Sequence, residues 1–125
     1  MDNKIKTFQD LFAWKKGHEM VLEIYQLTKS FPSEEKFGLV SQVRRASVSV
    51  TSNLAEGFGR RWRKEKIHFY DTSLASLYEV QNQLLIVRDV GFISMDQFNK
   101  LYYLTQDTQR LINALIRSIA SSGPS

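Results

Sequence analysis

The chain has 125 residues, of which 42% are hydrophobic, so it has enough apolar material for one compact domain with its own core. It contains no cysteine, which excludes disulfide scaffolds, thiolate zinc sites, iron–sulfur clusters and cysteine catalysis. The net charge is +4, and all of it lies in residues 60–66, which carry five cations and one carboxylate.

The sequence has no apolar run of 18 residues, so we expect no membrane-spanning segment. Its first residues, MDNKIKTF, lack the apolar segment of a signal peptide, so we expect a cytoplasmic location. Only two prolines and six glycines interrupt long stretches of helix-forming residues. These features predict an all-α fold with a single domain over residues 1–125 and helices at about 9–30, 34–58, 63–90 and 95–120.

The first predicted helix has an apolar stripe with spacings of three and four residues. We expect this stripe to face the core, with His18 as a buried core histidine. It consists of Leu11, Trp14, His18, Val21, Tyr25 and Thr28, widened by Leu22. The helix also carries apolar bulk outside the stripe, at Phe12, Met20, Ile24 and Leu27.

The other three predicted helices are bounded by capping residues. Ser33 is a suitable N-cap for the second helix, and Gly57 and Gly59 mark its end. Ser94 and Gln97 form a capping box that opens the fourth helix. The apolar material of the second helix is Phe37, Val40, Val43, Val50, Leu54 and Phe58.

The third predicted helix has two apolar stripes, one through Leu77 and Leu84 and a second with Phe69, Val80, Val87 and Val90. Because short links between long helices place them antiparallel, the chain is expected to form an up-down-up-down four-helix bundle. The interior of such a bundle needs only one stripe per helix, so the second stripe and the spare bulk of the first helix favour a homo-oligomer.

The strongest candidate site is the basic segment between the second and third helices. Arginine binds phosphate through two hydrogen bonds, lysine acts as a point charge, and a tryptophan among them can stack on an unpaired base. The alternative is a solvated helix corner without a ligand, because cations interact favourably with the C-terminal end of the preceding helix. The candidate nucleic-acid-binding residues are Arg60, Arg61, Trp62, Arg63, Lys64 and Lys66.

Polar residues, interspersed with small ones, form a strip along one face of the second predicted helix. We favour a buried polar network that fixes the register of the bundle or forms an oligomer contact, and the alternative is a functional site. Its members are Gln42, Arg45, Asn53 and Glu56, joined by Glu79 of the third helix.

The sequence offers little for catalysis. Glu65 and His68 have the Glu-x-x-His spacing of a di-metal bundle, but the second such pair is missing. There is no phosphate loop, dinucleotide fingerprint or Gly-x-Ser-x-Gly motif. We therefore expect no catalytic residues, no metal and no cofactor, and a metal-dependent nuclease using Glu56 and Glu79 is the least favoured alternative.

Four motifs and their order are similar to those of a known family. They are Phe8-x-x-Leu11-x-x-Trp14-Lys15-Lys16, Phe31-Pro32-x-x-Glu35-x-Phe37-Gly38-Leu39, Gln42-Val43-Arg44-Arg45-Ala46 and Asn53-Leu54-Ala55-Glu56-Gly57-Phe58-Gly59-Arg60. With them the chain resembles the four-helix-bundle proteins encoded in intervening sequences of bacterial large-subunit ribosomal RNA genes. It departs from their pattern at Trp62, Ser73 and Tyr78.

The resemblance implies a ring-like homopentamer and a role with RNA. A related branch of this family serves as accessory subunits of reverse transcriptases in diversity-generating retroelements, which implies a polymerase partner as an alternative. The family brings no catalytic residues. The sequence therefore predicts a non-enzymatic, oligomeric, nucleic-acid-binding bundle that prefers structured RNA to DNA, and the alternative is a protein-interaction adaptor.

Overall fold

The computed structural model describes residues 4–122, so residues 1–3 and 123–125 of the predicted domain lie outside it. The all-α prediction is confirmed, and no strand is present within 4–122. The four helices are α1 (Phe12–Thr28), α2 (Leu39–Phe58), α3 (Arg63–Asp89) and α4 (Met95–Ala120). Two short 3-10 turns, η1 (Phe8–Asp10) and η2 (Ser33–Glu35), precede α1 and α2.

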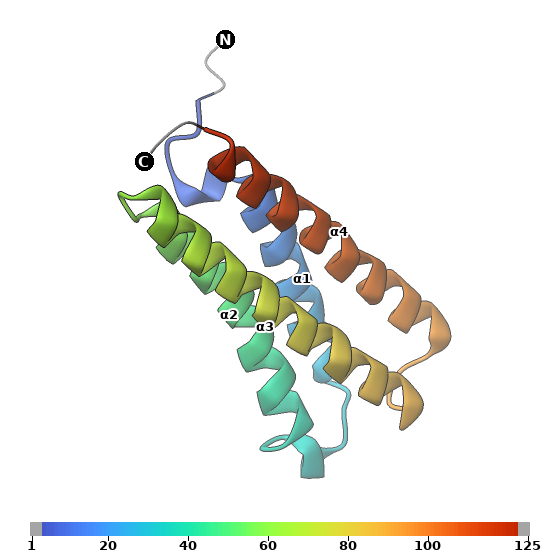
Figure 1. Cartoon of the computed structure of the whole chain (residues 1–125). Coiled ribbons are helices and arrows are strands. Elements are labelled where there is room, and N and C mark those ends of the chain that lie inside the picture. The colour runs from blue at the N-terminus through green and yellow to red at the C-terminus, as the bar shows by residue number, and fades with distance from the viewer. Residues whose placement is uncertain (1–3, 123–125) are drawn as a thin grey trace.

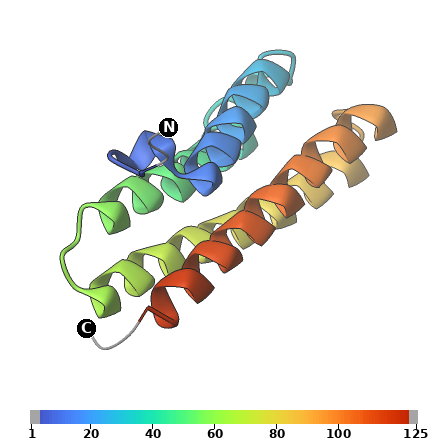
Figure 2. The ribbon, with the colours of Figure 1, turned by 90° about the horizontal axis from the view of Figure 1, so that it is seen from above.

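The helices form the predicted up-down-up-down bundle, in which α1 contacts α2 and α4, and α3 contacts the same two helices (Figure 1). Seen from above, α1 and α2 form one layer and α3 and α4 the other (Figure 2). The α2–α3 turn lies at one end, as do the start of α1 and the end of α4, and the α1–α2 and α3–α4 links lie at the opposite end.

The predicted beginnings of the first two helices are wrong. The extended backbone of Leu11 (ψ 127°) separates η1 from α1. Residues 33–35 form η2, so Ser33 does not cap α2, which begins six residues later. Glu35 takes over part of that role, because its Oε1 accepts a hydrogen bond of 3.3 Å from the backbone N–H of Leu39.

The α3–α4 link follows the expected capping chemistry. Gly91 has φ +82°, which favours glycine, and the backbone N–H of Phe92 donates to Val87 O at 3.1 Å to close the end of α3. The predicted capping box of α4 is confirmed: Gln97 N donates to Ser94 Oγ at 3.1 Å, and Ser94 N donates to Gln97 Oε1 at 2.9 Å.

The predicted core face of the first helix is only partly right. The face of α1 that enters the core passes through Ala13, Gly17, Met20 and Ile24, so two residues assigned as spare bulk are buried. His18 is exposed and stacks on Trp14, with 4.6 Å between ring centroids, so it is not a core histidine. Small residues at two of the core positions allow close helix packing, which a count of apolar bulk does not reveal.

Both stripes of α3 serve the bundle itself. Leu77 and Leu84 are buried, and so are Val80 and Val87 of the supposed second stripe, because α3 packs between α2 and α4. Val90 of the second stripe remains exposed, and the other exposed apolar side chains belong to neither stripe of α3. The large apolar side chains exposed within 4–122 are Ile5, Phe12, Leu22, Tyr25, Phe37, Val48, Trp62, Tyr78, Ile86, Val90, Met95 and Tyr103.

Helix α2 packs tightly against α3 at Gly57. A Cβ atom at this position would lie 2.7 Å from Tyr70 Cε1 and 2.9 Å from Phe69 Cβ. Tyr70 is almost fully buried, so its ring has no free space into which to move. We expect Gly57→Ala to lower the free energy of unfolding by about 1–3 kcal/mol through overpacking, measured by urea denaturation.

The matched control for this substitution is Gly59→Ala. A Cβ at Gly59 meets only backbone oxygens at 3.6 Å and 3.8 Å, and the residue has an ordinary φ of −75°. Its effect should stay within about 0.5 kcal/mol of wild type. Equal stability of the two variants would show that the close approach does not constrain the α2–α3 packing.

Candidate nucleic-acid interface

The basic segment forms a corner of the molecule where α2 ends and α3 begins. Gly59 ends α2, and Trp62 takes the N-cap position of α3 with an extended backbone (φ −96°, ψ 141°). No side chain accepts a hydrogen bond at this cap, so the first backbone N–H groups of α3 have no side-chain partner there. We call Arg60, Arg61, Trp62, Arg63, Lys64 and Lys66 the basic corner.

Lys66 has a structural role in this corner. Its ammonium group donates to Phe58 O at 2.7 Å and to Gly57 O at 3.4 Å, and so satisfies carbonyl groups at the end of α2. It also lies 5.3 Å from the centroid of the Phe58 ring. Burial lowers the pKa of Lys66, since desolvation disfavours the charged ammonium. This cation is therefore occupied within the chain.

Arg60 is also engaged. One of its guanidinium nitrogens donates to Glu56 Oε1 at 2.8 Å, and the group stacks 4.5 Å from the centroid of the Phe69 ring. Both partners of the ion pair are partly exposed, so the pair adds little to stability. The pair also neutralises the charge of one of the five cations of the corner.

The remaining three cations of the corner are free. Arg61, Arg63 and Lys64 form no ion pair with a carboxylate of residues 4–122. The Arg61 guanidinium lies 5.9 Å from the Trp62 ring, whose side chain is 55% exposed. Free cations beside an exposed indole and an uncapped helix start form a surface suited to phosphate and base contacts.

The predicted polar strip does not form a buried network within this chain. Gln42, Arg45, Glu56 and Glu79 are exposed, and only Asn53 is partly buried. Asn53 Nδ2 donates to Ser49 O at 2.8 Å, on its own helix. The expectation of burial is therefore wrong for the single chain, and an oligomer contact at this strip stays a prediction.

A small hydroxyl contact joins α2 and α3 beneath the strip. Ser49 Oγ and Ser76 Oγ lie 2.8 Å apart, in hydrogen-bond contact. On α3, Gln83 Nε2 donates to Glu79 Oε2 at 3.3 Å, on the same helix. Glu56 and Glu79 thus have separate partners, which gives the nuclease alternative no support.

The sequence model of the 23S rRNA-intervening sequence protein family matches residues 9–114. The chain belongs to this family. Its fold is similar to the crystal structure of a protein of unknown function from the S23 ribosomal protein family of Bacteroides thetaiotaomicron, with a TM-score of 0.78. That match has 21% sequence identity and covers 84% of this chain and 95% of the other, and at this identity it shows the fold alone. No curated protein matches the sequence.

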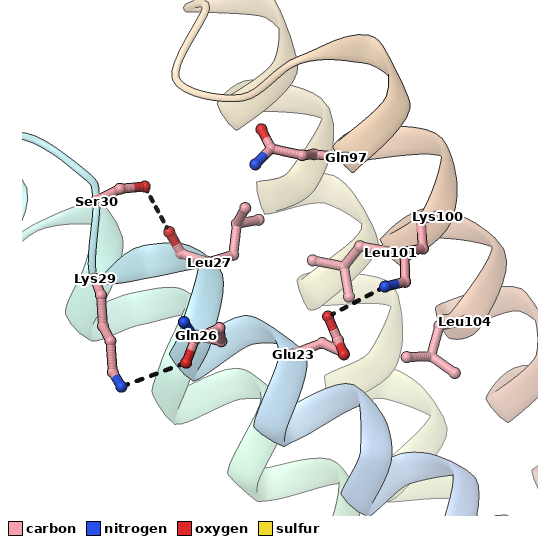
Figure 3. Close-up of a pocket in the computed structure, with 9 residues that line it drawn as sticks. All are labelled: Glu23, Gln26, Leu27, Lys29, Ser30, Gln97, Lys100, Leu101 and Leu104. Carbon is pink, nitrogen blue, oxygen red and sulfur yellow. Dashed lines mark hydrogen bonds and ion pairs between the residues drawn. The ribbon is translucent and has the colours of Figure 1, made fainter.

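A cavity of this 23S rRNA-intervening sequence family member lies between the end of α1 and the start of α4, at the opposite end of the bundle from the basic corner (Figures 1 and 3). Its volume is about 490 Å³. The polar groups that line it are tied to near neighbours: Lys29 to Gln26, Ser30 to Leu27 O, and Lys100 to Glu23 at 4.0 Å. The lining offers no nucleophile paired with a base.

Residues 4–122 hold neither a cluster of metal-ligating side chains nor a membrane-spanning helix. No three side chains among histidine, aspartate and glutamate are grouped so that they could hold a metal ion. None of the described helices combines the length and the apolar character needed to cross a bilayer.

The residues of the basic corner were predicted from the sequence of this family member. The side-chain partners of Arg60 and Lys66 were not. The i,i+4 spacing of Glu56 and Arg60 is a signal that could have revealed their ion pair. No local signal points to the bond from Lys66 to the end of α2, because it depends on how the turn folds back.

Proposed function

We propose that this protein is a non-enzymatic nucleic-acid-binding bundle, located in the cytoplasm, that binds structured RNA through the basic corner. The observation that carries the proposal is the group of three cations, Arg61, Arg63 and Lys64, without a carboxylate partner within 4–122, around the exposed Trp62. The name of the family links it to 23S ribosomal RNA genes, which supports RNA over DNA as the ligand.

The position of these cations supports an anionic ligand. A helix begins with a partial positive charge, so cations at the start of α3 are unfavourable by themselves. A phosphate group placed there would interact favourably with the cations and with the free N–H groups of the first turn. The basic corner is thus more stable with an anion than without one.

Assembly would strengthen weak contacts at a single corner. The homopentamer implied by the family resemblance would present about fifteen free cations, three from each chain, to one RNA molecule. The exposed apolar side chains outside the corner, such as Leu22, Tyr78 and Ile86, are available for contacts between copies.

The test is a salt titration of binding to an RNA hairpin, with single-stranded DNA of equal length as the comparison. Three phosphate contacts per chain predict a slope of about −2.7 for log K against log salt on the duplex stem. RNA should bind more tightly than DNA if the protein reads helix shape or 2′-hydroxyl groups. Absence of RNA binding at low salt, or a slope near zero, would overturn the proposal.

The second candidate is a protein-interaction adaptor, for example beside a polymerase such as a reverse transcriptase. One observation favours it: Tyr78 and Ile86 of α3, and Val90 just after it, are large apolar residues that remain exposed. Apolar contacts are insensitive to salt, so capture of a polymerase at high salt and without nucleic acid would support this candidate.

A further inference from the structure

A second group of cations and aromatic side chains lies at the other end of α2 from the basic corner. It lines a pocket of about 380 Å³ between the end of α1, the residues after η2 and the first two turns of α2. We call it the Phe37 pocket, and its lining residues are Tyr25, Lys36, Phe37, Val40, Ser41, Arg44 and Arg45. Three of them are cations and none is a carboxylate.

The aromatic ring of Phe37 is in water. Its side chain is 89% exposed, although it belongs to the apolar material of the second predicted helix. The ammonium group of Lys36 lies 5.5 Å from its centroid. Burying a phenylalanine side chain stabilises a protein by about 1.5–3 kcal/mol, a gain that this position forgoes in the free chain.

Arg44 is held in a fixed orientation beside this ring. Its Nε donates to Thr28 Oγ1 at 2.8 Å, one terminal nitrogen donates to Tyr25 O at 3.3 Å, and the guanidinium stacks 4.6 Å from the Tyr25 ring centroid. These contacts use one side of the guanidinium and leave the other terminal nitrogen without a partner in residues 4–122. The donor is pre-organised for a ligand.

The pocket also keeps an unbalanced charge. Arg45 donates a hydrogen bond to Ser41 Oγ at 3.4 Å, and none of the three cations pairs with a carboxylate of the described residues. Glu34 and Glu35 precede the pocket in sequence, but Glu35 is bound to the backbone of Leu39. Cations without acidic partners in the chain favour a ligand that carries phosphate groups over an apolar partner that has no acidic residues.

We propose that the Phe37 pocket binds an unpaired nucleotide, with the base stacked on Phe37 and the adjacent phosphates bound by Lys36, Arg44 and Arg45. An exposed aromatic ring gives a base a stacking surface whatever its sequence, and the cations follow the backbone on either side. The inference rests on the proposed function, because it assigns single-stranded segments of the same RNA to a second surface.

The basic corner and the Phe37 pocket then bind different parts of the RNA. The basic corner binds phosphates of a stem, and the Phe37 pocket binds a loop or a strand end. The two sites lie at opposite ends of α2, about 30 Å apart for 20 helical residues. An RNA with both a stem and an unpaired segment is therefore the ligand that engages both sites of one chain or of neighbouring copies.

The experiment compares two RNAs with equal numbers of phosphates, a hairpin with an unpaired loop and a blunt duplex, against wild type and Phe37→Ala. The hairpin carries 2-aminopurine in its loop, whose fluorescence falls when the base stacks. Phe37→Ala should bind the hairpin about tenfold more weakly, keep its affinity for the duplex within about twofold, and lose the fluorescence change.

Phe12→Ala is the matched control. Phe12 is 73% exposed, and Lys15 lies 5.7 Å from its ring centroid, but no arginine lines its surroundings. This variant should bind both RNAs as wild type does. As a second measurement, Arg45→Gln should reduce the salt slope for a single strand by about 0.7.

Three results would overturn the inference, and they differ from one another. If both RNAs bind Phe37→Ala as tightly as wild type, the pocket has no role in RNA binding and the proposed function stands. If Phe37→Ala changes only the mass of the oligomer, the pocket is a protein contact. If neither RNA binds wild type at low salt, the proposed function fails together with the pocket.

Discussion

Replacing Arg61, Arg63 and Lys64 together with glutamate is expected to weaken binding to an RNA hairpin by at least about 100-fold at 0.1 M salt. Each phosphate contact contributes about 0.9 to the log–log salt slope, so three contacts account for a loss of this size before repulsion is counted. Fluorescence anisotropy with labelled RNA measures the affinity. Helicity should be retained, since acidic residues are favourable in the first turn of α3.

The control variant replaces three exposed lysines elsewhere with glutamate and so makes the same change in net charge. These lysines are Lys15, Lys29 and Lys100. If the corner is the binding surface, this variant loses far less affinity than the corner variant. Equal losses would mean that the net charge of the protein, and not this surface, determines binding. Unchanged affinity of the corner variant would refute the assignment outright.

Replacing Ile24 with alanine is expected to lower the free energy of unfolding by about 2–5 kcal/mol. The side chain is 1% exposed and belongs to the main core cluster of the bundle, so its truncation leaves a cavity in the core. Thermal unfolding followed by circular dichroism measures the effect. A domain of this size loses about 4 °C in Tm per kcal/mol.

Leu22→Ala is the comparison on the same helix, because Leu22 is 57% exposed. Its unfolding free energy at low protein concentration should stay within about 0.5 kcal/mol of wild type. A loss that appears only at high concentration would place Leu22 in an interface between copies. A large loss for Leu22 and a small loss for Ile24 would restore the core face predicted from the sequence.

The sequence was sufficient for the number of helices, their order and the N-terminal cap of α4. Ser94 and Gln97 act through short-range backbone geometry, which is why they are readable from local spacing. The start of α2 was not readable in this way. Ser33 has the chemistry of an N-cap, but the intervening η2 turn and Gly38 delay the helix.

The faces of the helices were harder to predict than their positions. On α1, Trp14, His18 and Tyr25 recur with helical spacing as regularly as Ala13, Gly17 and Ile24 do. Periodicity finds both stripes, and only packing decides that the stripe with small residues enters the core. On α3, contact with two neighbouring helices buries residues that looked surplus.

In the candidate site, too, the positions of the residues were predictable and their side-chain contacts were not. Residue type and position in the chain located the basic corner. Side-chain partners then separated its cations into Arg60 and Lys66, which are engaged within the chain, and the three that are free. The Phe37 pocket escaped sequence reasoning because Tyr25 and Arg44 are brought together by the contact between α1 and α2.

The order of contacts around the bundle also bears on how the chain folds and opens. Three of the four helix pairings join consecutive helices, and only the pairing of α1 with α4 joins distant parts of the sequence. The contact between α1 and α4 has the largest cost in loop-closure entropy. It therefore forms late in folding and is the first contact to open transiently. The α2–α3 hairpin does not depend on the α1–α4 contact, so the turn that carries the basic corner stays assembled when α1 and α4 separate.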